Sequence, residues 1–561
     1  MKTSFENIKN ERVFDYLLLI LLALILVFVV YVRIRLLTVP LERDEGEYAY
    51  MGQLLLKGYA PFIHAYTMKL PGVSAIYALF MLLFGQTITA IHMGLLIVNI
   101  ICTLFVFLLA QRLYGRQAAL IACASYALLS LSESVLGIFA HATHFIVLFA
   151  LAGFLLLLRA LELRNLPILL WSGVCFGLSF IMKQHAATLI VFAFLYFSWR
   201  GFRQVGEKRY FAQGLMVFLL GVTIPYLLLV LYLVWAGTFG RFWLWTVHYA
   251  RAYTSISTPI ERIQNFIGHI FPMYPLYPIL LLAGVGIVAC WRSREPGNDR
   301  PFVFGMLFFS FLAVCPGFFF RPHYFVPLLP ALAILAGTGA ISIGHRCKSQ
   351  KLGRALPVSL LVVSAAFAIY CESEYAFSLT PPEVSNKIYG PANNFNVATQ
   401  IASYVRNHTR LDERIAVLGS EPEIYFYADR ISATNYLYMY SLMEDQPYAQ
   451  GMEAELIRDI ESVAPAYIVV DNSAMLLIQK SIWSKSLFDW LDQYLRESYE
   501  CVGAVDIHES DAAFYWDKNV AKYTTGDLTS GSITVFKHMR IKNQNLEGER
   551  KRYNGNILPG I

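Results

Sequence analysis

Long apolar segments separated by basic residues are the feature that most constrains this chain. Of its 561 residues, 57% are hydrophobic and only 15% are charged. An uninterrupted apolar run of about 18 residues or more is typical of a membrane-spanning helix. The sequence therefore predicts a polytopic α-helical membrane protein with about eleven spans, at roughly 16–32, 87–110, 117–137, 141–161, 167–182, 185–199, 212–236, 272–291, 301–319, 322–343 and 354–372.

The basic residues between these spans indicate how the chain is oriented. If the N-terminus is cytoplasmic, the short loops on the cytoplasmic side carry Arg112, Arg116, Arg159, Arg164, Arg200, Arg203, Lys208, Arg209, Arg292, Arg294, Arg300, Arg346, Lys348, Lys351 and Arg354. This asymmetry follows the positive-inside rule. An odd number of spans then places everything after about residue 373 outside the membrane. The net charge of +6 reflects this topology, so nucleic acid is not a predicted partner.

A soluble composition returns in the last third of the chain. Helices are predicted at 393–408, 452–463 and 486–497, with strands at 414–418 and 466–471. Helices that alternate with strands are typical of a small α/β unit. The predicted organisation is a membrane module over 1–372 with its first outer loop at 39–86, an extracytoplasmic α/β domain over 388–540, and a disordered tail over 541–561.

The first outer loop contains the densest polar cluster, LERDEGEYAYMGQLLLKGYAPFIHAYTMKLPG at 41–72. Asp44 and Glu47 have the spacing of a capping box, which predicts a helix over 45–57. This helix is too short and too polar to span a bilayer, so it should lie in the membrane interface. Asp44 is then either a helix cap alone or a catalytic carboxylate.

The same loop ends in a lysine beside a predicted helix start. Pro71 suits the first position of a short helix over 71–84, and Lys69 lies just before it. A cation next to unpaired backbone N–H groups forms an anion site that a phosphate would fit. The alternative is that Lys69 only extends its ammonium group to the membrane interface.

Other cationic residues fall at the outer ends of predicted spans. Arg321 and His323 flank Pro322 at another helix start, and Lys183 occupies a tight turn between two apolar helices. These residues are either phosphate contacts or interfacial anchors. Together with the carboxylate of Asp44, they suggest a hydroxyl that is activated against a phosphorylated substrate.

A metal site is a weaker alternative on the same side. His141 and His144 are three residues apart on one predicted helix face, and Glu133 precedes them. Histidines with a carboxylate can bind a divalent metal, although interfacial histidines are also common. The sequence requires no cofactor, and it lacks a glycine-rich fingerprint for a nucleotide.

Three motifs carry a resemblance to a known family: the RDEGEYAY…KLPG loop, the KQH turn at 183–185 and RPHYFVPLLPAL at 321–332. They resemble bacterial members of the protein O-mannosyltransferase-like group, in the GT-C superfamily that includes the lipid A aminoarabinose transferases. The resemblance covers about residues 10–345. It implies a GT-C fold and transfer of a sugar from a polyprenyl-phosphate carrier to a lipid, glycan or protein acceptor at the extracytoplasmic face of the membrane.

The resemblance also implies roles for individual residues. Asp44 matches the first-loop aspartate that acts as general base on the acceptor, and Lys69 matches the lysine near the carrier phosphate. The resemblance also implies that Arg321 and His323 contact the phosphate. In the aminoarabinose branch a glutamate precedes the lysine, but this chain has Met68 there, so the metal site and lipid A acceptor of that branch are not supported.

Further candidates complete the predicted site. Glu45 is expected to orient it, and Lys183 and Tyr66 are candidate substrate contacts. A single base predicts one displacement with inversion, because a retaining enzyme needs a second, nucleophilic carboxylate. One alternative is a transporter or flippase of lipid-linked sugars, but such proteins place polar groups near the membrane midplane. A glycan polymerase or ligase is the other alternative.

Overall fold

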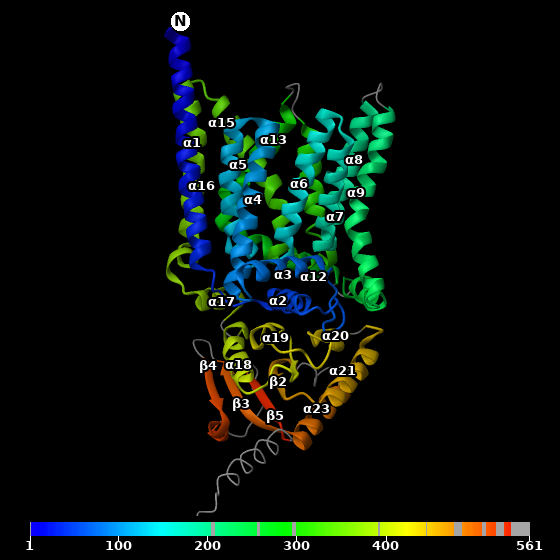
Figure 1. Ribbon diagram of the computed structural model, residues 1–561. Coiled ribbons are helices and arrows are strands. Elements are labelled where there is room, and N and C mark those ends of the chain that lie inside the picture. The colour runs from blue at the N-terminus through cyan, green and yellow to red at the C-terminus, as the bar shows by residue number, and fades with distance from the viewer. Residues whose placement is uncertain are drawn as a thin grey trace, which may run out of the picture. The chain divides into compact units, whose positions relative to one another are not determined.

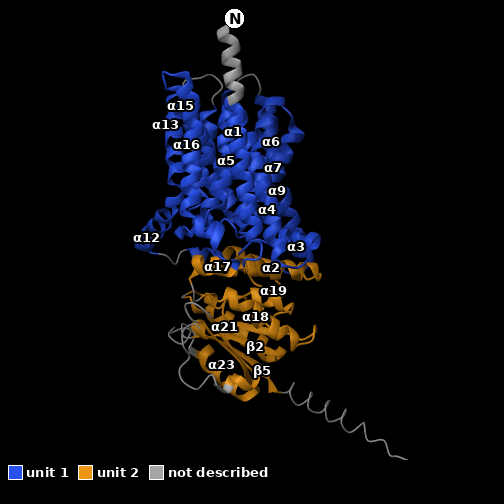
Figure 2. Ribbon diagram, turned by 90° about the vertical axis from the view of Figure 1, so that its left-hand side faces the viewer, with its two compact units in different colours: residues 1–39, 69–239, 250–381 blue, residues 40–68, 240–249, 382–561 orange. Residues whose placement is uncertain are grey.

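The computed structural model describes residues 2–203, 208–254, 258–293, 299–390, 393–444, 446–475, 485–507, 512–522 and 532–539. The chain forms two compact units (Figure 2). Unit 1 comprises Met1–Val39, Lys69–Phe239 and Ala250–Pro381, and unit 2 comprises Pro40–Met68, Gly240–Tyr249 and Pro382–Ile561. The predicted tail over 541–561 lies outside the described residues.

The regular elements of unit 1 are all helices among its described residues (Figure 1). Its α-helices are α1 (Lys2–Arg35), α3 (Gly72–Phe84), α4 (Ile88–Tyr114), α5 (Arg116–Leu131), α6 (Ala142–Leu163), α7 (Leu166–Met182), α8 (Ala187–Arg203), α9 (Lys208–Trp235), α11 (Ala250–Thr254), α12 (Pro259–Ile270), α13 (Tyr277–Arg292), α14 (Arg300–Leu312), α15 (Leu329–His345) and α16 (Gln350–Cys371). Short 3-10 or π segments join them: η1 (Glu133–Val135), η2 (Gln184–Ala186), η5 (Phe271–Leu276), η6 (Pro316–Phe318), η7 (Pro322–Leu328) and η8 (Glu374–Ser378).

The predicted membrane fold is confirmed. Among the described residues, seven helical stretches are long and apolar enough to cross a membrane: Phe14–Arg35, Ile88–Tyr114, Ala142–Leu163, Lys208–Trp235, Pro259–Arg292, Pro322–His345 and Gln350–Cys371. Four shorter apolar helices are α3, α5, α7 and α14. All eleven predicted spans coincide with helices of unit 1. The number of helices that actually cross the membrane stays a prediction.

Small residues allow the helices of unit 1 to pack closely, as is usual in membrane bundles. On α13, a Cβ atom at Gly286 would lie 1.9 Å from the carbonyl oxygen of Leu335 on α15. On α15, a Cβ atom at Gly339 would lie 2.0 Å from the carbonyl oxygen of Leu282. The backbones of α13 and α15 are therefore in direct contact on both sides of this crossing.

Unit 2 contains a mixed five-stranded sheet in the order β1-β2-β5-β3-β4. Its strands are β1 (Ile415–Leu418), β2 (Tyr467–Asp471), β3 (Tyr499–Ile507), β4 (Ala512–Trp516) and β5 (Ser532–His538). Only β1 and β2 are parallel; the other pairs are antiparallel. The sequence analysis identified β1 and β2 but not β3, β4 or β5.

Helices of unit 2 come from three separate parts of the chain. They are α2 (Arg43–Leu56), α10 (Phe239–Trp243), the π-helix η4 (Leu244–Tyr249), α17 (Pro381–Tyr389), α18 (Phe395–Asn407), α19 (Glu423–Ala428), α20 (Tyr440–Met443), α21 (Ala449–Val463), α23 (Lys485–Ser498) and the 3-10 helix η9 (Asp517–Lys522). The predicted helices over 393–408, 452–463 and 486–497 correspond to α18, α21 and α23. The first outer loop up to Met68 and the segment Gly240–Tyr249 thus fold with the C-terminal domain.

The α13–α15 crossing generates a stability prediction. Gly286→Ala should destabilise unit 1 by about 1–3 kcal/mol, because the new methyl group meets a backbone carbonyl that cannot move independently. The thermal unfolding midpoint of the purified protein in detergent measures this effect. Gly284→Ala is the matched control: it lies on the same helix, and a Cβ atom added there would have nothing within 4 Å. Equal unfolding midpoints for the two variants would contradict the proposed close packing.

Candidate active site

The turn that carries Lys69 is fixed against the end of α7. The sequence predicted that Pro71 opens α3; the helix begins one residue later, at Gly72, and Pro71 is its N-cap residue. A Cβ atom at Gly72 would lie 2.4 Å from the carbonyl oxygen of Ile181, so the first turn of α3 packs directly on the last turn of α7. Lys69 is half-buried just before this contact. The contact therefore brings the Lys69 turn to the end of α7, where Lys183 follows.

Lys183 lies in the tight turn between α7 and η2, also as predicted. Its side chain is buried, and Nζ lies 4.2 Å from the centroid of the Tyr324 ring. His185 meets the same ring edge-on, with centroids 4.6 Å apart, and its Nδ1 is 2.8 Å from the carbonyl oxygen of Ala313. A cation over an aromatic face is stabilised electrostatically, which offsets part of the cost of burying Lys183.

A third turn brings Arg321 and His323 to the same place. Arg321 is the N-cap residue of η7, and Pro322 occupies its first turn. The His323 ring stacks on the ring of His141, with centroids 3.9 Å apart and planes 14° from parallel. His141 follows Ala140, whose carbonyl oxygen accepts a hydrogen bond of 2.8 Å from Tyr77 of α3.

These contacts gather four predicted residues into one cationic cluster within unit 1. The positive charges of Lys69, Lys183 and Arg321 all act on the His323 imidazole. Arg321 is exposed, whereas Lys183 and His323 are buried. Several cations that are held together attract an anion, and a phosphate group matches their charge and size.

The histidines differ from their predicted grouping. Sequence spacing joined His141 to His144 on one helix face, but the ring that stacks on His141 is that of His323. His144 is buried in the first turn of α6, and Glu133 lies in η1. Imidazole nitrogens are good metal ligands. A metal site on His141, His144 and Glu133 stays a prediction.

The predicted capping role of Asp44 is wrong. Helix α2 begins at Arg43, and its N-cap is Glu42. Glu42 Oε1 accepts a hydrogen bond of 2.9 Å from the backbone N–H of Glu45, and Glu45 Oε2 accepts one of 3.4 Å from the N–H of Glu42. Two pairs of carboxylates in this loop have the spacing of a capping box, Glu42 with Glu45 and Asp44 with Glu47. The box forms at the first pair, two residues earlier than predicted.

This shift places Asp44 inside the first turn of α2, where it is half-buried. The neighbouring Glu45 and Glu47 are fully buried. Glu47 Oε2 accepts a hydrogen bond of 2.6 Å from the hydroxyl of Tyr438. Glu42, Glu45 and Glu47 therefore each hold the helix in place, whereas Asp44 takes no part in the capping box or in the tyrosine contact.

Tyr66 belongs to a polar and aromatic cluster of unit 2. Its hydroxyl donates a hydrogen bond of 3.0 Å to Glu455 Oε1, and Tyr436 donates one of 3.0 Å to Oε2 of the same carboxylate. Arg241 forms an ion pair of 2.9 Å with Glu455. The ring of Tyr66 also packs against Trp245. This predicted substrate contact therefore joins three segments of unit 2.

Behind α2, a buried acidic group lies at the carboxyl ends of β1 and β2. Asn394 donates hydrogen bonds to Glu421 (3.1 Å) and to Asp471 (3.3 Å). Burial, reinforced by the charge of Asp471, raises the pKa of Glu421 to about 7. Arg43 of α2 is the nearby cation, with its Nη2 3.9 Å from Glu421 Oε1.

Glu423 is a second buried acid, at the start of α19. Its side chain has no exposed surface, and neither carboxylate oxygen has a hydrogen-bond partner among the described residues. Burial, followed by the charge of Glu421, raises its pKa well above the usual range. Burial therefore favours the neutral form of Glu423, because an unpaired charge at this position would be costly.

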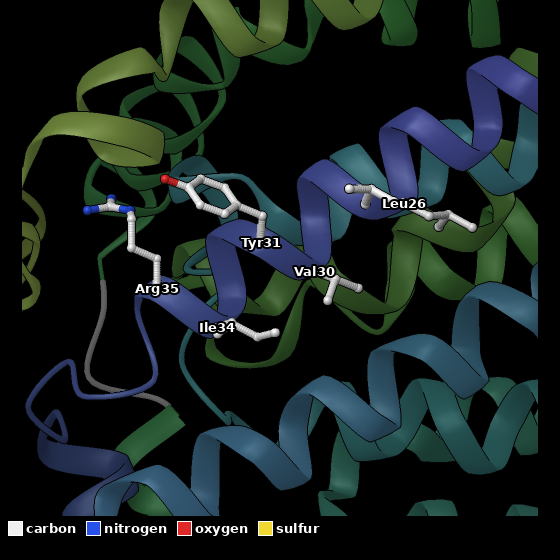
Figure 3. A pocket seen from close by; sticks show the side chains of 6 residues that line it. Leu26, Val30, Tyr31, Ile34 and Arg35 are labelled. Atoms are coloured by element: carbon white, nitrogen blue, oxygen red, sulfur yellow. The ribbon is translucent and has the colours of Figure 1, made fainter.

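An open groove of about 630 Å³ lies along the last third of α1 (Figure 3). It is lined by Leu26, Val27, Val30, Tyr31, Ile34 and Arg35. Arg35 donates hydrogen bonds to the carbonyl oxygens of Tyr375 and Leu379, which closes α1 onto η8. None of the predicted site residues lines this groove.

The buried acid Glu421 generates a pH prediction. Its raised pKa means that the folded protein holds a proton which the unfolded chain releases above about 4.5. Folding stability attributable to this group therefore falls as the pH rises from about 4.5 to about 7 and is constant above. Glu421→Gln removes this titration. The difference between its thermal unfolding midpoint and that of wild type should therefore be more positive at pH 8 than at pH 5.

The control for this measurement is Glu497→Gln, which changes an exposed carboxylate on α23. Its unfolding midpoint relative to wild type should be independent of pH. If the difference in unfolding midpoint between Glu421→Gln and wild type is also independent of pH, the raised pKa of Glu421 is contradicted.

Two comparisons with known proteins bear on this arrangement. Residues 67–248 match the family model of the dolichyl-phosphate-mannose-protein mannosyltransferases. This segment begins two residues before Lys69 and includes His141 and Lys183. No curated protein sequence matches the chain significantly.

Solved structures resemble most of the chain at low sequence identity. ArnT from Cupriavidus metallidurans in the apo state is 14% identical, with a TM-score of 0.55 over 92% of this chain and 97% of that one. The same protein bound to undecaprenyl phosphate is 15% identical, with a TM-score of 0.54 over 82% and 94%. The archaeal oligosaccharyltransferase AglB from Archaeoglobus fulgidus, with an inhibitory peptide and dolichol phosphate, is 13% identical, with a TM-score of 0.50 over 90% and 74%.

The family match and the structural matches agree with each other. The family model covers the part of unit 1 that carries two of the predicted cations, and the fold likeness extends over both units. They confirm the resemblance that the three sequence motifs predicted. Residues 67–248 are thus similar to the dolichyl-phosphate-mannose-protein mannosyltransferases, and the chain is an integral membrane protein with the fold of ArnT.

Proposed function

We propose that this enzyme transfers a sugar from a polyprenyl-phosphate carrier to an acceptor hydroxyl at the extracytoplasmic face of the membrane. The observation that carries the proposal is that three turns of unit 1 meet. Gly72, after Lys69, packs on Ile181 at the end of α7. Lys183 Nζ lies 4.2 Å from the ring centroid of Tyr324, which follows Arg321 and His323. A cationic cluster at the end of apolar helices suits a phosphate that is attached to a lipid tail. The carriers bound in the similar structures, undecaprenyl phosphate and dolichol phosphate, are molecules of this class.

The cations serve both binding and chemistry. When the sugar leaves its carrier, the bond between the anomeric carbon and the phosphate oxygen breaks, and the phosphate keeps the electron pair. Lys69, Arg321 and Lys183 stabilise the negative charge that develops there. His323, whose ring stacks on that of His141, is the fourth residue of this cluster. Because the phosphate leaves as a stable anion, no general acid is needed to protonate it. Tyr66 is a further candidate contact for the substrate.

Asp44 is the general base. It accepts the proton of the acceptor hydroxyl while the hydroxyl oxygen forms a bond to the anomeric carbon. Glu45 orients this carboxylate indirectly, because it closes the capping box that sets the first turn of α2. One displacement by the acceptor inverts the anomeric centre, and no carboxylate is assigned the role of a nucleophile. The acceptor is a lipid, a glycan or a protein.

The orientation of the chain follows from its loop charges. The N-terminus is cytoplasmic, and the membrane module over 1–372 presents its first outer loop, 39–86, to the extracytoplasmic side. The α/β domain over 388–540 is extracytoplasmic as well. The positive-inside rule supports this orientation, since the basic loop residues fall on the side opposite to Asp44 when the predicted spans are counted.

Substitution of the base separates catalysis from folding. Asp44→Asn should lower the rate of sugar transfer on the order of a hundredfold to ten-thousandfold, because the amide cannot accept the proton. Carrier binding and the unfolding midpoint should change little, since Glu42 and not Asp44 caps the helix. The assay is transfer from a polyprenyl-phosphate-linked sugar by purified protein in nanodiscs. A variant with a rate close to wild type would refute the assignment of Asp44.

Substitution of a cation tests the carrier site. Lys69→Ala should weaken binding of polyprenyl phosphate by about tenfold to a hundredfold, the usual value of a charge-assisted hydrogen bond. Binding can be followed by the quenching of intrinsic fluorescence in nanodiscs. Lys351→Ala is the control, because Lys351 is an exposed lysine on the predicted cytoplasmic side. Equal affinities of the two variants for polyprenyl phosphate would contradict the assignment of Lys69 as a phosphate contact.

A further inference from the structure

One face of α2 is fixed to the C-terminal domain along its whole length. Arg43 donates a hydrogen bond of 2.8 Å from Nε to the carbonyl oxygen of Ser420. Tyr50 accepts one of 2.8 Å from the backbone N–H of Ser432. Just beyond the helix, Lys57 forms an ion pair of 2.7 Å with Asp429. These contacts begin at the first turn of α2 and continue past its end.

Between them, α2 lies against the backbone of α19. A Cβ atom at Gly46 would lie 2.7 Å from both the Cβ atom and the backbone nitrogen of Glu423. Only glycine fits at this contact. The fully buried carboxyl group of Glu423 lies at the same interface, where an ionised group would be destabilising.

A tyrosine of the C-terminal domain completes the contact face. The Tyr438 hydroxyl is 2.6 Å from Glu47 Oε2 and 3.3 Å from the carbonyl oxygen of Arg43. It therefore joins the first and second turns of α2. Its ring stacks on that of Tyr440, with centroids 4.9 Å apart, so the hydroxyl is held in a fixed direction.

The contacting positions form one helical stripe. Arg43, Gly46, Glu47 and Tyr50 are separated by three, one and three residues, so they share a face of α2. Successive residues of an α-helix are rotated by about 100° around its axis. Asp44 is thus about 100° from Arg43, on the flank of the stripe. A helix held along one stripe cannot rotate about its axis, and the direction of Asp44 is set by that restriction.

We infer that the C-terminal domain is part of the catalytic machinery, because it fixes the rotation of α2 and thereby the direction of the Asp44 carboxylate. Tyr438 and Glu47 are the principal positioning residues, and the contact between Gly46 and Glu423 sets the distance between α2 and α19. None of them touches the reacting atoms. This inference rests on the proposed role of Asp44 as general base. Misplacement of a catalytic group by about 1 Å can cost about a hundredfold in rate.

Removal of the positioning hydroxyl is the first test. Tyr438→Phe keeps the ring and deletes the two contacts to α2. It should lower kcat for sugar transfer by about tenfold or more, while KM for the polyprenyl-phosphate-linked donor stays unchanged, because the cationic cluster is intact. Tyr404→Phe is the matched control: its hydroxyl donates a hydrogen bond of 2.8 Å to Asp517 in the same domain, away from α2. Its kcat should equal that of wild type, and Tyr438→Phe should be compared with wild type at a temperature where both are folded.

A glycine substitution tests the same restriction from another side. Gly46→Ala should displace α2 from Glu423 and lower kcat by about tenfold or more. Gly451→Ala, on α21, is its control, because no atom lies within 4 Å of the added methyl group. Wild-type kcat for both Tyr438→Phe and Gly46→Ala would overturn the inference. A fall in kcat that is matched by the two controls would also overturn it, since it would reflect general destabilisation.

A double substitution separates this inference from the proposed function. In the Asp44→Asn background, Tyr438→Phe should cause no further loss, because there is no base left to position. If Asp44→Asn abolishes transfer but Tyr438→Phe alone is fully active, the positioning role is wrong and the proposed function stands. If Asp44→Asn is itself active, the assignment of the base has failed, whatever the result for Tyr438→Phe.

Discussion

The contact between Gly72 and Ile181 is the constraint on which the cationic cluster of unit 1 depends. At a distance of 2.4 Å from the Ile181 carbonyl oxygen, a side chain at position 72 has no space. The contact ties the start of α3 to the end of α7, and Tyr77 of α3 then donates to Ala140 beside the histidine turn. Helix α3 thus aligns two turns that are far apart in the sequence. Without this alignment, Lys69 would be an isolated interfacial lysine.

Gathering cations costs free energy, because like charges repel and burial removes water. The structure offsets this cost locally. Lys183 lies over the face of Tyr324, and Arg321 lies 5.8 Å from the centroid of Phe319. These aromatic contacts stabilise each cation without neutralising its charge. The cluster therefore keeps its affinity for an anion. A carboxylate in place of either ring would stabilise the cation more strongly, but it would compete with a phosphate.

Short-range signals made much of this site predictable from the sequence. Pro71 and Pro322 mark helix starts, and the cations beside them lie where the pattern placed them. The stack of His323 on His141 was not predictable, because it depends on how distant helices pack. The capping box was misplaced for a local reason: Glu42, Asp44, Glu45 and Glu47 offer two pairs with the same spacing. Only the tertiary contacts of Glu47 decide between them.

The C-terminal domain illustrates the same limit. Its parallel strands β1 and β2 follow helices and are bounded by turn residues, so their pattern is strong. Strand β5 pairs antiparallel with β2 and β3 over long separations. Every residue of β4 is partly exposed, which weakens its buried pattern. The folding of Gly240–Tyr249 with this domain was also not predictable, because the ion pair between Arg241 and Glu455 joins residues more than 200 positions apart.

The hydrogen bonds of the other first-loop carboxylates are compatible with the proposed role of Asp44 as the single base. Four carboxylates within six residues would repel one another if all were exposed and ionised. Glu42 and Glu45 instead accept hydrogen bonds from backbone N–H groups, and Glu47 accepts one from the hydroxyl of Tyr438. Each hydrogen bond stabilises a carboxylate that would otherwise be costly to bury. The same contacts make α2 rigid. In the proposed mechanism, the neighbouring acids therefore position α2, and Asp44 alone accepts the proton.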